Sequence, residues 1–404
     1  MSSLLKVWEK IVAESEEAQI AEGEKKGLVK NFLLDDVYLR ESAFAAKIFA
    51  TEYIRTCDEK FLQKAKMALD ALQKIFNEKD MTQGLEEPTW TPRGIRLRKG
   101  SIPATIILLY AIDETTKLID YKFIYNIKAI LDYLALCYLG NGKFYHDKVD
   151  RNNKGHKFHV VNTTAMSYLF LQMAKSKDIT NSFYRQEIKK IEKAIKRSQR
   201  ADGFWSYFEP NIFQKFLWFF SPMIPDIVLK IYNKIMEDRS IFFGDALHHV
   251  VSIYYFLAAK NEVASTLGHG EKEMLTRGWS FIKNDLKERC DKEIYFDFSW
   301  EPKPKSLRYC NFIDTSTYFY ILNLLRLLVK YTIVTENERE HYTNGIVNHI
   351  AKNLMSNTTP SIRAYEGSMD IIQNIIPRPS ESIFDKGFLI SSLVLDSIGS
   401  DYPL

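Results

Sequence analysis

Residues 163–209 contain one complete unit of the pattern that decides the fold: "TTAMSYLFLQMAKSKDITNSFYRQEIKKIEKAIKRSQRADGFWSYFE". The first part, 163–174, is apolar on nearly all sides of a helix, whereas 184–199 carries Lys, Arg and Glu on one face. A helix that is apolar all round is buried, and one with a polar face lies at the surface. The stretch then turns at Asp202-Gly203, a pair that suits tight turns, and continues with aromatic residues. The unit therefore predicts an inner helix, an outer helix and an aromatic turn.

The same unit recurs along the whole chain. Strong helix formers with apolar residues at i, i+3 and i+4 predict twelve helices. These helices are expected at 4–20, 36–56, 59–77, 101–116, 119–138, 161–176, 180–199, 243–260, 270–288, 313–333, 336–355 and 383–398. The even-numbered segments are apolar almost all round, and the odd-numbered segments have a charged face. This alternation predicts an all-α protein, an (α/α)6 toroid (barrel) of six inner and six outer helices, formed by a single domain over 1–404.

The composition limits the classes of function. Of the 404 residues, 46% are hydrophobic and 26% are charged, which is typical of a soluble globular protein. The net charge of +4 is small for this length, so no nucleic-acid partner is expected. The four cysteines lack paired spacing and are expected to be free thiols in a reducing compartment. Without a signal peptide or an apolar run long enough to span a bilayer, the sequence predicts a cytoplasmic protein.

The connections after the outer helices also repeat. The segments 141–147, 202–209, 292–301 and 362–367 each contain a polar turn followed by aromatic and polar residues in alternation. These segments predict short β-hairpin-like aromatic turns on one face of the toroid. In repeat proteins, long loops on one face are often the binding face. Polar residues that open the next inner helix either cap that helix or surround the mouth of the central cavity: Asn162, Asp245, Asp314 and Asp385.

The candidate catalytic residues can transfer a proton or act as a nucleophile. Histidine titrates near neutral pH, and a pair of carboxylates can hydrolyse a glycosidic bond. The candidates on the loop face are His146, Asp147, Tyr207, Glu209, His248, Glu301, Asp314, Tyr365 and Glu366. His248 and His249 differ by about 100° around a helix, so at most one of them faces the cavity and the other is expected to be a core histidine.

The candidate substrate-binding residues are flat aromatic rings and polar or charged groups. An aromatic face stacks on the C–H face of a pyranose, and a guanidinium pairs with a carboxylate or phosphate through two hydrogen bonds. These candidates are Trp90, Arg93, Arg96, Asn162, Trp205, Asp245, His249, Trp300, Arg308, Arg378 and Asp385. The alternative is structural: the tryptophans pack loops onto helix ends, and the basic run 93–99 is a solvated loop.

Alternation along a short strand predicts opposite roles for the two aromatic residues at 204 and 205. Side chains of successive strand residues point to opposite faces, so Trp205 and Tyr207 are expected to face the ligand while Phe204 packs in the core. The sequence predicts neither a cofactor nor a metal site. His146, His156 and His159 lie in one loop but lack the spacing of a structural zinc site.

One segment interrupts the repeat. Residues 211–242 are rich in aromatic and apolar residues, as in "FLWFFSPMIPDIVL" at 216–229. They are interpreted as a helical hairpin folded over the toroid, a lid over its mouth, or a membrane-surface element. Trp and Phe beside Lys suit a lipid headgroup boundary, so peripheral membrane contact through 211–232 is the functional alternative.

The motif at the end of the opening stretch resembles one known from other toroids. Gln199, Gly203 and Trp205 match the Gln-x3-Gly-x-Trp pattern of α/α-toroid proteins of the terpene-cyclase and prenyltransferase class. The helix alternation is similar to the wider (α/α)6 superfamily, which includes glycoside hydrolases, polysaccharide lyases, sugar 2-epimerases and uronyl C5-epimerases. The Asp-x-Asp-Asp signature of the cyclases is absent from this sequence.

The resemblance implies the fold and leaves the reaction open. The favoured function is a carbohydrate-active enzyme that acts on a glycan, neutral or acidic, by glycosidic cleavage, β-elimination or epimerisation. The alternatives are a terpenoid or prenyl-chain enzyme of the same fold, and a non-catalytic toroid that binds a glycan or a protein. The sequence leaves the oligomeric state open.

Overall fold

The computed structural model describes residues 3–31, 36–91, 94–147, 159–205, 246–289, 292–296, 312–314, 316–354 and 365–367. Within these residues, six helices form an outer ring: α1 (Ser3–Ala18), α3 (Glu59–Glu78), α5 (Ile127–Leu136), α7 (Ser182–Ser198), α11 (His269–Lys283) and α13 (Glu336–His349). Five helices form an inner ring: α2 (Leu39–Thr56), α4 (Ile102–Leu118), α6 (Val161–Ser176), α10 (Ala246–Glu262) and α12 (Ser316–Lys330). A 3-10 turn, Met81–Gln83, and a π-helix, Ile350–Leu354, complete the helical elements of this part of the chain.

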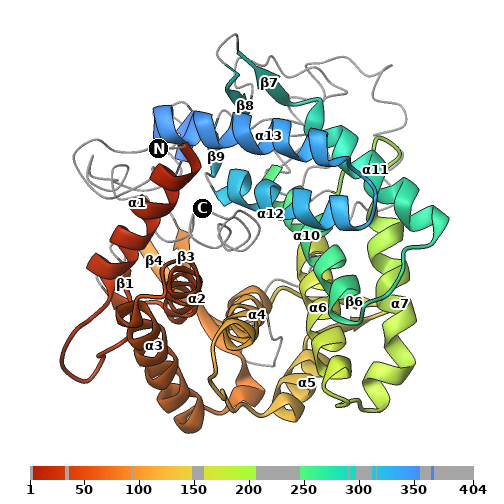
Figure 1. Ribbon diagram of the computed structural model, residues 1–404. Coiled ribbons are helices and arrows are strands. Elements are labelled where there is room, and N and C mark those ends of the chain that lie inside the picture. Colours follow the sequence, from red (N-terminus) through yellow and green to blue (C-terminus); the bar gives the residue numbers. More distant parts are fainter. Residues whose placement is uncertain are drawn as a thin grey trace.

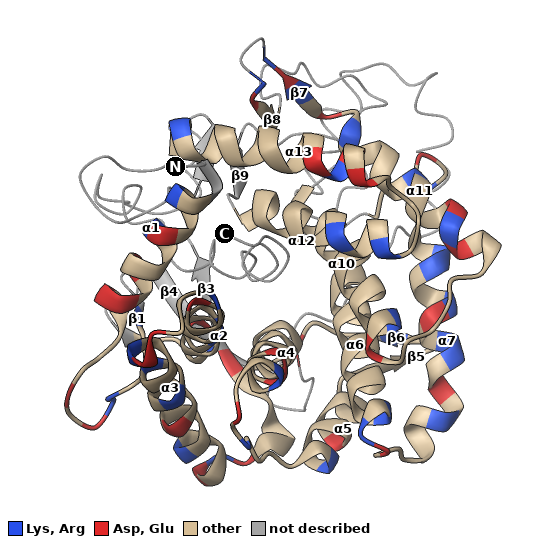
Figure 2. Cartoon of the chain, in the orientation of Figure 1, with Lys and Arg blue, Asp and Glu red and all other residues tan. Residues whose placement is uncertain are grey.

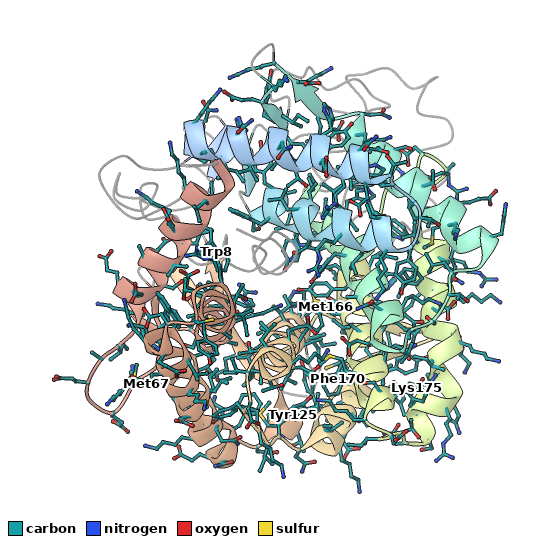
Figure 3. The ribbon with its side chains drawn as sticks, in the orientation of Figure 1. Trp8, Met67, Tyr125, Met166, Phe170 and Lys175 are labelled. Carbon is teal, nitrogen blue, oxygen red and sulfur yellow. The ribbon has the colours of Figure 1, made fainter. Side chains whose placement is uncertain are left out.

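The two rings are concentric (Figure 1). Each inner helix packs against the next in the order α2, α4, α6, α10 and α12, and α1 packs against α13, which closes the outer ring. The contact between α1 and α2 includes a hydrogen bond of 2.6 Å from the Trp8 indole to Glu52 (Figure 3). The all-α (α/α)6 toroid expected from the sequence is therefore confirmed. The sixth expected inner helix, 383–398, lies outside the described residues.

Burial explains why the helices sort into two rings. Every residue of α6 from Val161 to Ala174 is buried, whereas α7 buries only Tyr184, Ile191, Ala194, Ile195 and Ser198. Figure 2 shows the same contrast, with charged residues frequent on α7 and α11 and rare on α6. Full burial of a large apolar side chain contributes about 1.5–3 kcal/mol. A helix such as α6 is therefore stable only where other helices surround it.

Short antiparallel strand pairs lie between outer and inner helices. They are β1 (Lys30–Asn31) with β2 (Asp36–Val37), β3 (Leu85–Thr91) with β4 (Gly94–Ser101), β5 (Tyr138–Gly140) with β6 (Lys143–Phe144), β7 (Leu286–Glu288) with β8 (Ile294–Phe296), and β9 (Phe312–Asp314) with β10 (Tyr365–Gly367). A bridge between Gln199 and Trp205 occupies the corresponding place between α7 and α10. Because every inner helix begins after one of these links, the links share one side of the toroid, which we call the loop face. The aromatic turns predicted on one face are confirmed.

The largest difference in helix bounds is at α5. The sequence predicts a helix over 119–138, but α5 begins at Ile127 and residues 121–126 have no regular secondary structure. Their aromatic side chains contact α3: Tyr121 donates a hydrogen bond to Asp70 at 2.7 Å, and the Phe123 ring meets the Phe76 ring at 5.3 Å. These contacts between segments outweigh the local helix propensity.

None of the described helices is both long and apolar enough to cross a lipid bilayer. The insertion, 211–242, lies outside the described residues. Its assignment as a hairpin, a lid or a membrane-surface element therefore remains a prediction.

Candidate active site

The β5–β6 turn places a polar segment against the ends of two inner helices. Asn141 and Gly142 both have positive φ (53° and 81°), as a two-residue hairpin turn requires. A Cβ atom at Gly142 would lie 2.1 Å from the carbonyl oxygen of Lys190, so the turn presses directly on α7. Phe144 is fully buried at the end of the hairpin. The following residues, 145–147, are thereby held at the N-terminal ends of α4 and α6.

His146 and Asp147 form a buried hydrogen-bonded pair. The His146 Nδ1 atom lies 2.5 Å from Asp147 Oδ1, and the two residues are only 6% and 1% exposed. The backbone holds them in place, because Ile102 N–H donates to the His146 carbonyl at 3.0 Å and Asp147 forms a β-bridge with Ser101. With Nδ1–H donating to the carboxylate, the neutral ring carries its lone pair on Nε2. A carboxylate that orients an imidazole in this way is the arrangement of a general base.

A second segment of the chain completes this corner. A β-bridge joins Tyr145 to His159, and His159 Nε2 lies 2.9 Å from Thr164 Oγ1. Asn162 is 5% exposed, and its Oδ1 accepts a hydrogen bond of 2.9 Å from Thr163 N–H. Asn162 lies inside the first turn of α6, after the N-cap Val160, so its interpretation as a helix cap is wrong. We call Ser101, His146, Asp147, His159 and Asn162 together the His146 corner.

Two tyrosines beside the corner act as donors and not as bases. Burial raises the pKa of Tyr133 well above its usual value, and its hydroxyl donates to the Gly100 carbonyl at 2.7 Å. Burial and a hydrogen bond to Glu187 raise the pKa of Tyr138 to about 12. Both side chains are therefore protonated at neutral pH. At this corner His146 is the imidazole that a carboxylate orients, which makes it our candidate to accept a proton.

The Gln-x3-Gly-x-Trp motif forms a packing device that we call the Trp205 clasp, made of Gln199, Gly203, Trp205, His249 and Gly278. Gln199 Nε2 donates to the carbonyls of Gly203 (2.9 Å) and Met274 (2.8 Å), which ties the end of α7 to α11. Gly203 has a φ of 96°, and a Cβ atom there would lie 2.4 Å from the Arg277 carbonyl oxygen.

Both ring nitrogens of His249 have hydrogen-bond partners within the clasp. Trp205 N–H donates to His249 Nδ1 at 3.0 Å, so the ring proton is on Nε2, which lies 3.1 Å from the Gly278 carbonyl. The Trp205 indole N–H donates to the Ile195 carbonyl at 2.9 Å. The clasp therefore joins α7, α10 and α11 through hydrogen bonds that leave neither ring available to a substrate.

This arrangement corrects two expectations. Phe204 and Trp205 are both only 1% exposed, so the prediction that Trp205 faces the ligand while Phe204 packs is wrong for Trp205. Within the described residues Gln199 and Trp205 form an isolated bridge, and the turn inserts both rings beside His249. The substrate-binding role expected for His249 does not fit its buried, fully bonded ring. As their spacing on the helix predicts, His248 points elsewhere and is partly exposed.

Other predicted site residues are placed by their backbones. Strands β9 and β10 bring Asp314 opposite Tyr365, with Glu366 next to it, so three candidates from distant segments meet on the loop face. In the β3–β4 hairpin, Trp90 pairs with Ile95 and Arg96 pairs with Thr89. The hairpin continues through Ser101 into the His146 corner. The remaining candidates lie outside the described residues: Arg93, Tyr207, Glu209, Asp245, Trp300, Glu301, Arg308, Arg378 and Asp385.

Sequence reasoning missed the role of Ser101. Its hydroxyl caps α4 by accepting a hydrogen bond of 3.3 Å from Ala104 N–H, and its backbone pairs with Asp147. The sequence signal was present, because Ser followed by Pro103 near the first helical position marks a helix start. The pairing with Asp147 had no such signal.

One group of carboxylates in the described part of the chain has the spacing of a metal site, namely Asp113, Glu114 and Glu262. It lies at the C-terminal ends of α4 and α10, away from the loop face. Lys117 Nζ already lies 3.1 Å from Asp113, 2.7 Å from Glu114 and 3.1 Å from Glu262. The ammonium group occupies the position that a metal ion would take, so these residues form an ion-pair cluster.

No protein-family model matches this sequence, and no curated protein matches it either. Solved structures do match over nearly the whole chain. An unsaturated glucuronyl hydrolase specific for heparin is 12% identical and has a TM-score of 0.59, with 97% of this chain and 96% of that chain covered.

Two further matches are a cellobiose epimerase and a mannanase. Cellobiose 2-epimerase from Bacillus thermoamylovorans is 9% identical and has a TM-score of 0.60, with 98% of each chain covered. An inactive variant of an alpha-1,6-mannanase from Salegentibacter, in complex with alpha-1,6-mannotriose, is 10% identical and has a TM-score of 0.56, with 98% of this chain and 99% of that chain covered. At these identities the likeness shows the fold, and it agrees with the (α/α)6 toroid described above.

Proposed function

We propose that this protein is a carbohydrate-active enzyme that acts on a glycan at the loop face of the toroid. The observation that carries the proposal is the His146–Asp147 pair, buried at 2.5 Å where the ends of α4 and α6 meet. The similar solved structures support it, because they include a glucuronyl hydrolase, a cellobiose epimerase and a mannanase. The Gln-x3-Gly-x-Trp motif adds no support to the terpenoid alternative, because it is a packing device in this chain.

In the proposed mechanism His146 removes a proton and Asp147 stabilises the imidazolium that forms. In hydrolysis, His146 Nε2 takes a proton from a water molecule while the water oxygen attacks the anomeric carbon, and a carboxylic acid protonates the leaving oxygen. In epimerisation or β-elimination, the same nitrogen takes a proton from a sugar carbon. Glu366 is our candidate for the acid, because β10 pairs with the strand that precedes α12.

We further propose that the substrate is acidic. The β3–β4 hairpin leads through Ser101 into the His146 corner and carries Arg96 and Arg98 in β4, with Arg93 at the hairpin turn in the sequence. Guanidinium groups pair with carboxylates through two hydrogen bonds, so this hairpin suits a uronic acid.

The test is turnover of three probes: an unsaturated disaccharide from heparin lyase digestion, cellobiose and alpha-1,6-mannotriose, with products followed by NMR. His146→Gln should lower kcat about 10²–10⁴-fold on the probe that is turned over. Asp147→Asn should lower kcat as well, because the ring loses its orienting carboxylate. The matched control is His269→Gln, whose side chain is 89% exposed at the start of α11.

Two other outcomes would contradict parts of the proposal. Full activity of the His146→Gln protein would exclude His146 as the base. Binding of a probe in calorimetry without any turnover would mean that the toroid is a glycan-binding protein and not an enzyme.

A further inference from the structure

Four tyrosines from three inner helices meet inside the ring. Tyr110 comes from α4, Tyr254 and Tyr255 from α10, and Tyr320 from α12. Their ring centroids are 6.4 Å apart for Tyr110 and Tyr255, 5.0 Å for Tyr254 and Tyr255, and 5.6 Å for Tyr254 and Tyr320. The hydroxyls of Tyr255 and Tyr320 are 3.0 Å apart. We call these four residues the tyrosine layer.

The contacts of the tyrosine layer reach past one helix of the inner ring. Helices α4 and α10 are not neighbours, because α6 lies between them in the inner ring (Figure 1). A contact between Tyr110 and Tyr255 therefore reaches across the inner side of α6. On the other side of Tyr110, Lys47 of α2 places its ammonium 5.9 Å from the ring centroid. Side chains from α2, α4, α10 and α12 thus meet at one level of the ring.

A second layer lies beyond the tyrosines, toward the C-terminal ends of the inner helices. Lys117 of α4 joins Glu262 of α10 at 3.1 Å, again across α6, and Lys47 of α2 lies 3.9 Å from Glu114 of α4. Lys177, just after α6, pairs with Asp113. The end of the toroid opposite the loop face is therefore tied together by ion pairs as well as by aromatic rings.

Polar atoms with unused bonding capacity flank the tyrosine layer. Thr317 and Asn323 lie three residues before and after Tyr320, so they share its side of α12. Both residues are buried, and Thr317 Oγ1 and Asn323 Oδ1 have no hydrogen-bond partner among the residues that the structure describes. Because α12 begins at the loop face, Thr317 lies between that face and the tyrosines. A buried polar atom is normally hydrogen-bonded, so Thr317 suits a hydroxyl group of a ligand that enters from the loop face.

We propose that the tyrosine layer closes the inner end of the loop-face site, so that the enzyme binds the end of a glycan chain and acts on its terminal sugar. This inference rests on the proposed function. In this proposal the side chains of α4 and α10 that meet past α6 at two levels leave no path for a long chain through the ring. The substrate enters and the product leaves through the loop face alone.

The test compares chain lengths at equal mass. Alpha-1,6-manno-oligosaccharides and heparin lyase fragments, each in lengths of four and sixteen sugars, are offered to the full-length protein. If chain ends are the substrate, the initial rate should be about fourfold higher for the shorter chains, because their ends are four times more concentrated. Equal rates per mass would overturn the inference and leave the proposed function intact. No turnover at any length would overturn the proposed function and this inference together.

A second measurement uses an exposed cysteine thiol at the end of the toroid opposite the loop face. Cys57 follows α2 at the end opposite the loop face, and it is exposed, whereas Cys137 is buried. A biotin maleimide is attached to Cys57 in a chain that carries Cys290→Ser and Cys310→Ser, and avidin is then bound. The rates should be unchanged for both lengths. Slowing of the sixteen-sugar chains alone would mean that glycans pass through the ring, and would overturn the inference.

Discussion

Two turns that look alike in the sequence have different structures. Residues 141–147 follow α5 and residues 202–205 follow α7, and each contains a Gly turn, aromatic residues and a nearby histidine. At the Trp205 clasp, the His249 ring has a backbone partner on each nitrogen. At the His146 corner, His146 Nδ1 is bonded to a carboxylate. Equivalent positions of the repeat thus hold the helices together in one place and collect ionisable groups in the other.

The difference follows from the partner of each histidine. A backbone N–H and a backbone carbonyl bond to the two nitrogens of the His249 ring, which links the helices. At His146 the partner is a carboxylate oxygen instead, Asp147 Oδ1, at 2.5 Å from Nδ1. The chemistry of a histidine in this fold therefore depends on what the neighbouring turn supplies.

The same substitution at each of the two histidines should give the largest difference in kcat. His146→Gln should lower kcat by about 10²–10⁴-fold. His249→Gln should leave kcat of the folded protein close to wild type but lower the free energy of unfolding by roughly 1–3 kcal/mol, because it breaks two buried hydrogen bonds. Steady-state kinetics and urea unfolding measure the two effects. A loss of kcat in the His249→Gln protein at full folding would break the comparison.

Truncation of the clasp should have the next largest effect. Trp205→Ala removes a fully buried indole and should lower the free energy of unfolding by about 3–5 kcal/mol in urea titrations. The control is Leu139→Ala in β5, where the side chain is 41% exposed and the change should stay within about 0.5 kcal/mol. If Trp205→Ala kept its stability and lost glycan affinity, the ring would be a sugar platform after all.

The region around the clasp also contains a buried charge cluster that makes stability depend on pH. Burial alone would raise the pKa of Glu271, but bonds from Lys260 (2.7 Å), Lys196 (2.9 Å) and Gly268 N–H (2.9 Å) lower it from 4.5 to about 2. A lowered pKa in the folded state adds stability above pH 4.5 that is lost as the pH falls toward 2.

The matched measurement compares wild type with Glu271→Gln. The stability advantage of the wild type should be about 2–3 kcal/mol at pH 6 and should shrink steadily between pH 4.5 and pH 2. Urea unfolding at several pH values measures this difference. A constant difference over the whole range would mean that Glu271 does not titrate with a lowered pKa.

The smallest effect concerns two glycines of one helix. A Cβ atom at Gly278 would lie 2.9 Å from the Trp205 ring and 3.0 Å from Ile253, so Gly278→Ala should cost about 1–2 kcal/mol. At Gly270, also in α11, a Cβ atom meets nothing within 4 Å, and Gly270→Ala should stabilise the protein by about 0.4–1 kcal/mol. Thermal unfolding of both variants gives the comparison, and equal shifts would mean that Trp205 can move aside.

Much of the fold could be read from the sequence because helical periodicity is local and repeated. All eleven helices described here overlap expected segments, and the aromatic turns occur after the outer helices as predicted. The exceptions arise where distant segments meet. Residues 121–126 are not helical because they contact α3, and α12 begins three residues after the expected 313 because β9 pairs with β10.

The candidate site was less accessible to sequence reasoning. His146 and Asp147 were identified from their residue types, but the sequence assigned Trp205 the role of an exposed ring that it does not have. The contacts that decide where such side chains lie join residues far apart in the sequence. Trp205 meets His249, 44 residues away, and Tyr110 of α4 meets Tyr255 of α10.

The sequence by itself therefore determined the toroid, the alternation of inner and outer helices and the face that carries the long turns. Only the tertiary structure decided which histidine is bonded to backbone groups and which is paired with a carboxylate, and which tyrosines of the inner helices meet. The physical reason is the range of the interactions. Helix formation and burial patterns depend on residues a few positions apart. Hydrogen bonding and closure of the ring depend on contacts between helices, which only the folded chain brings together.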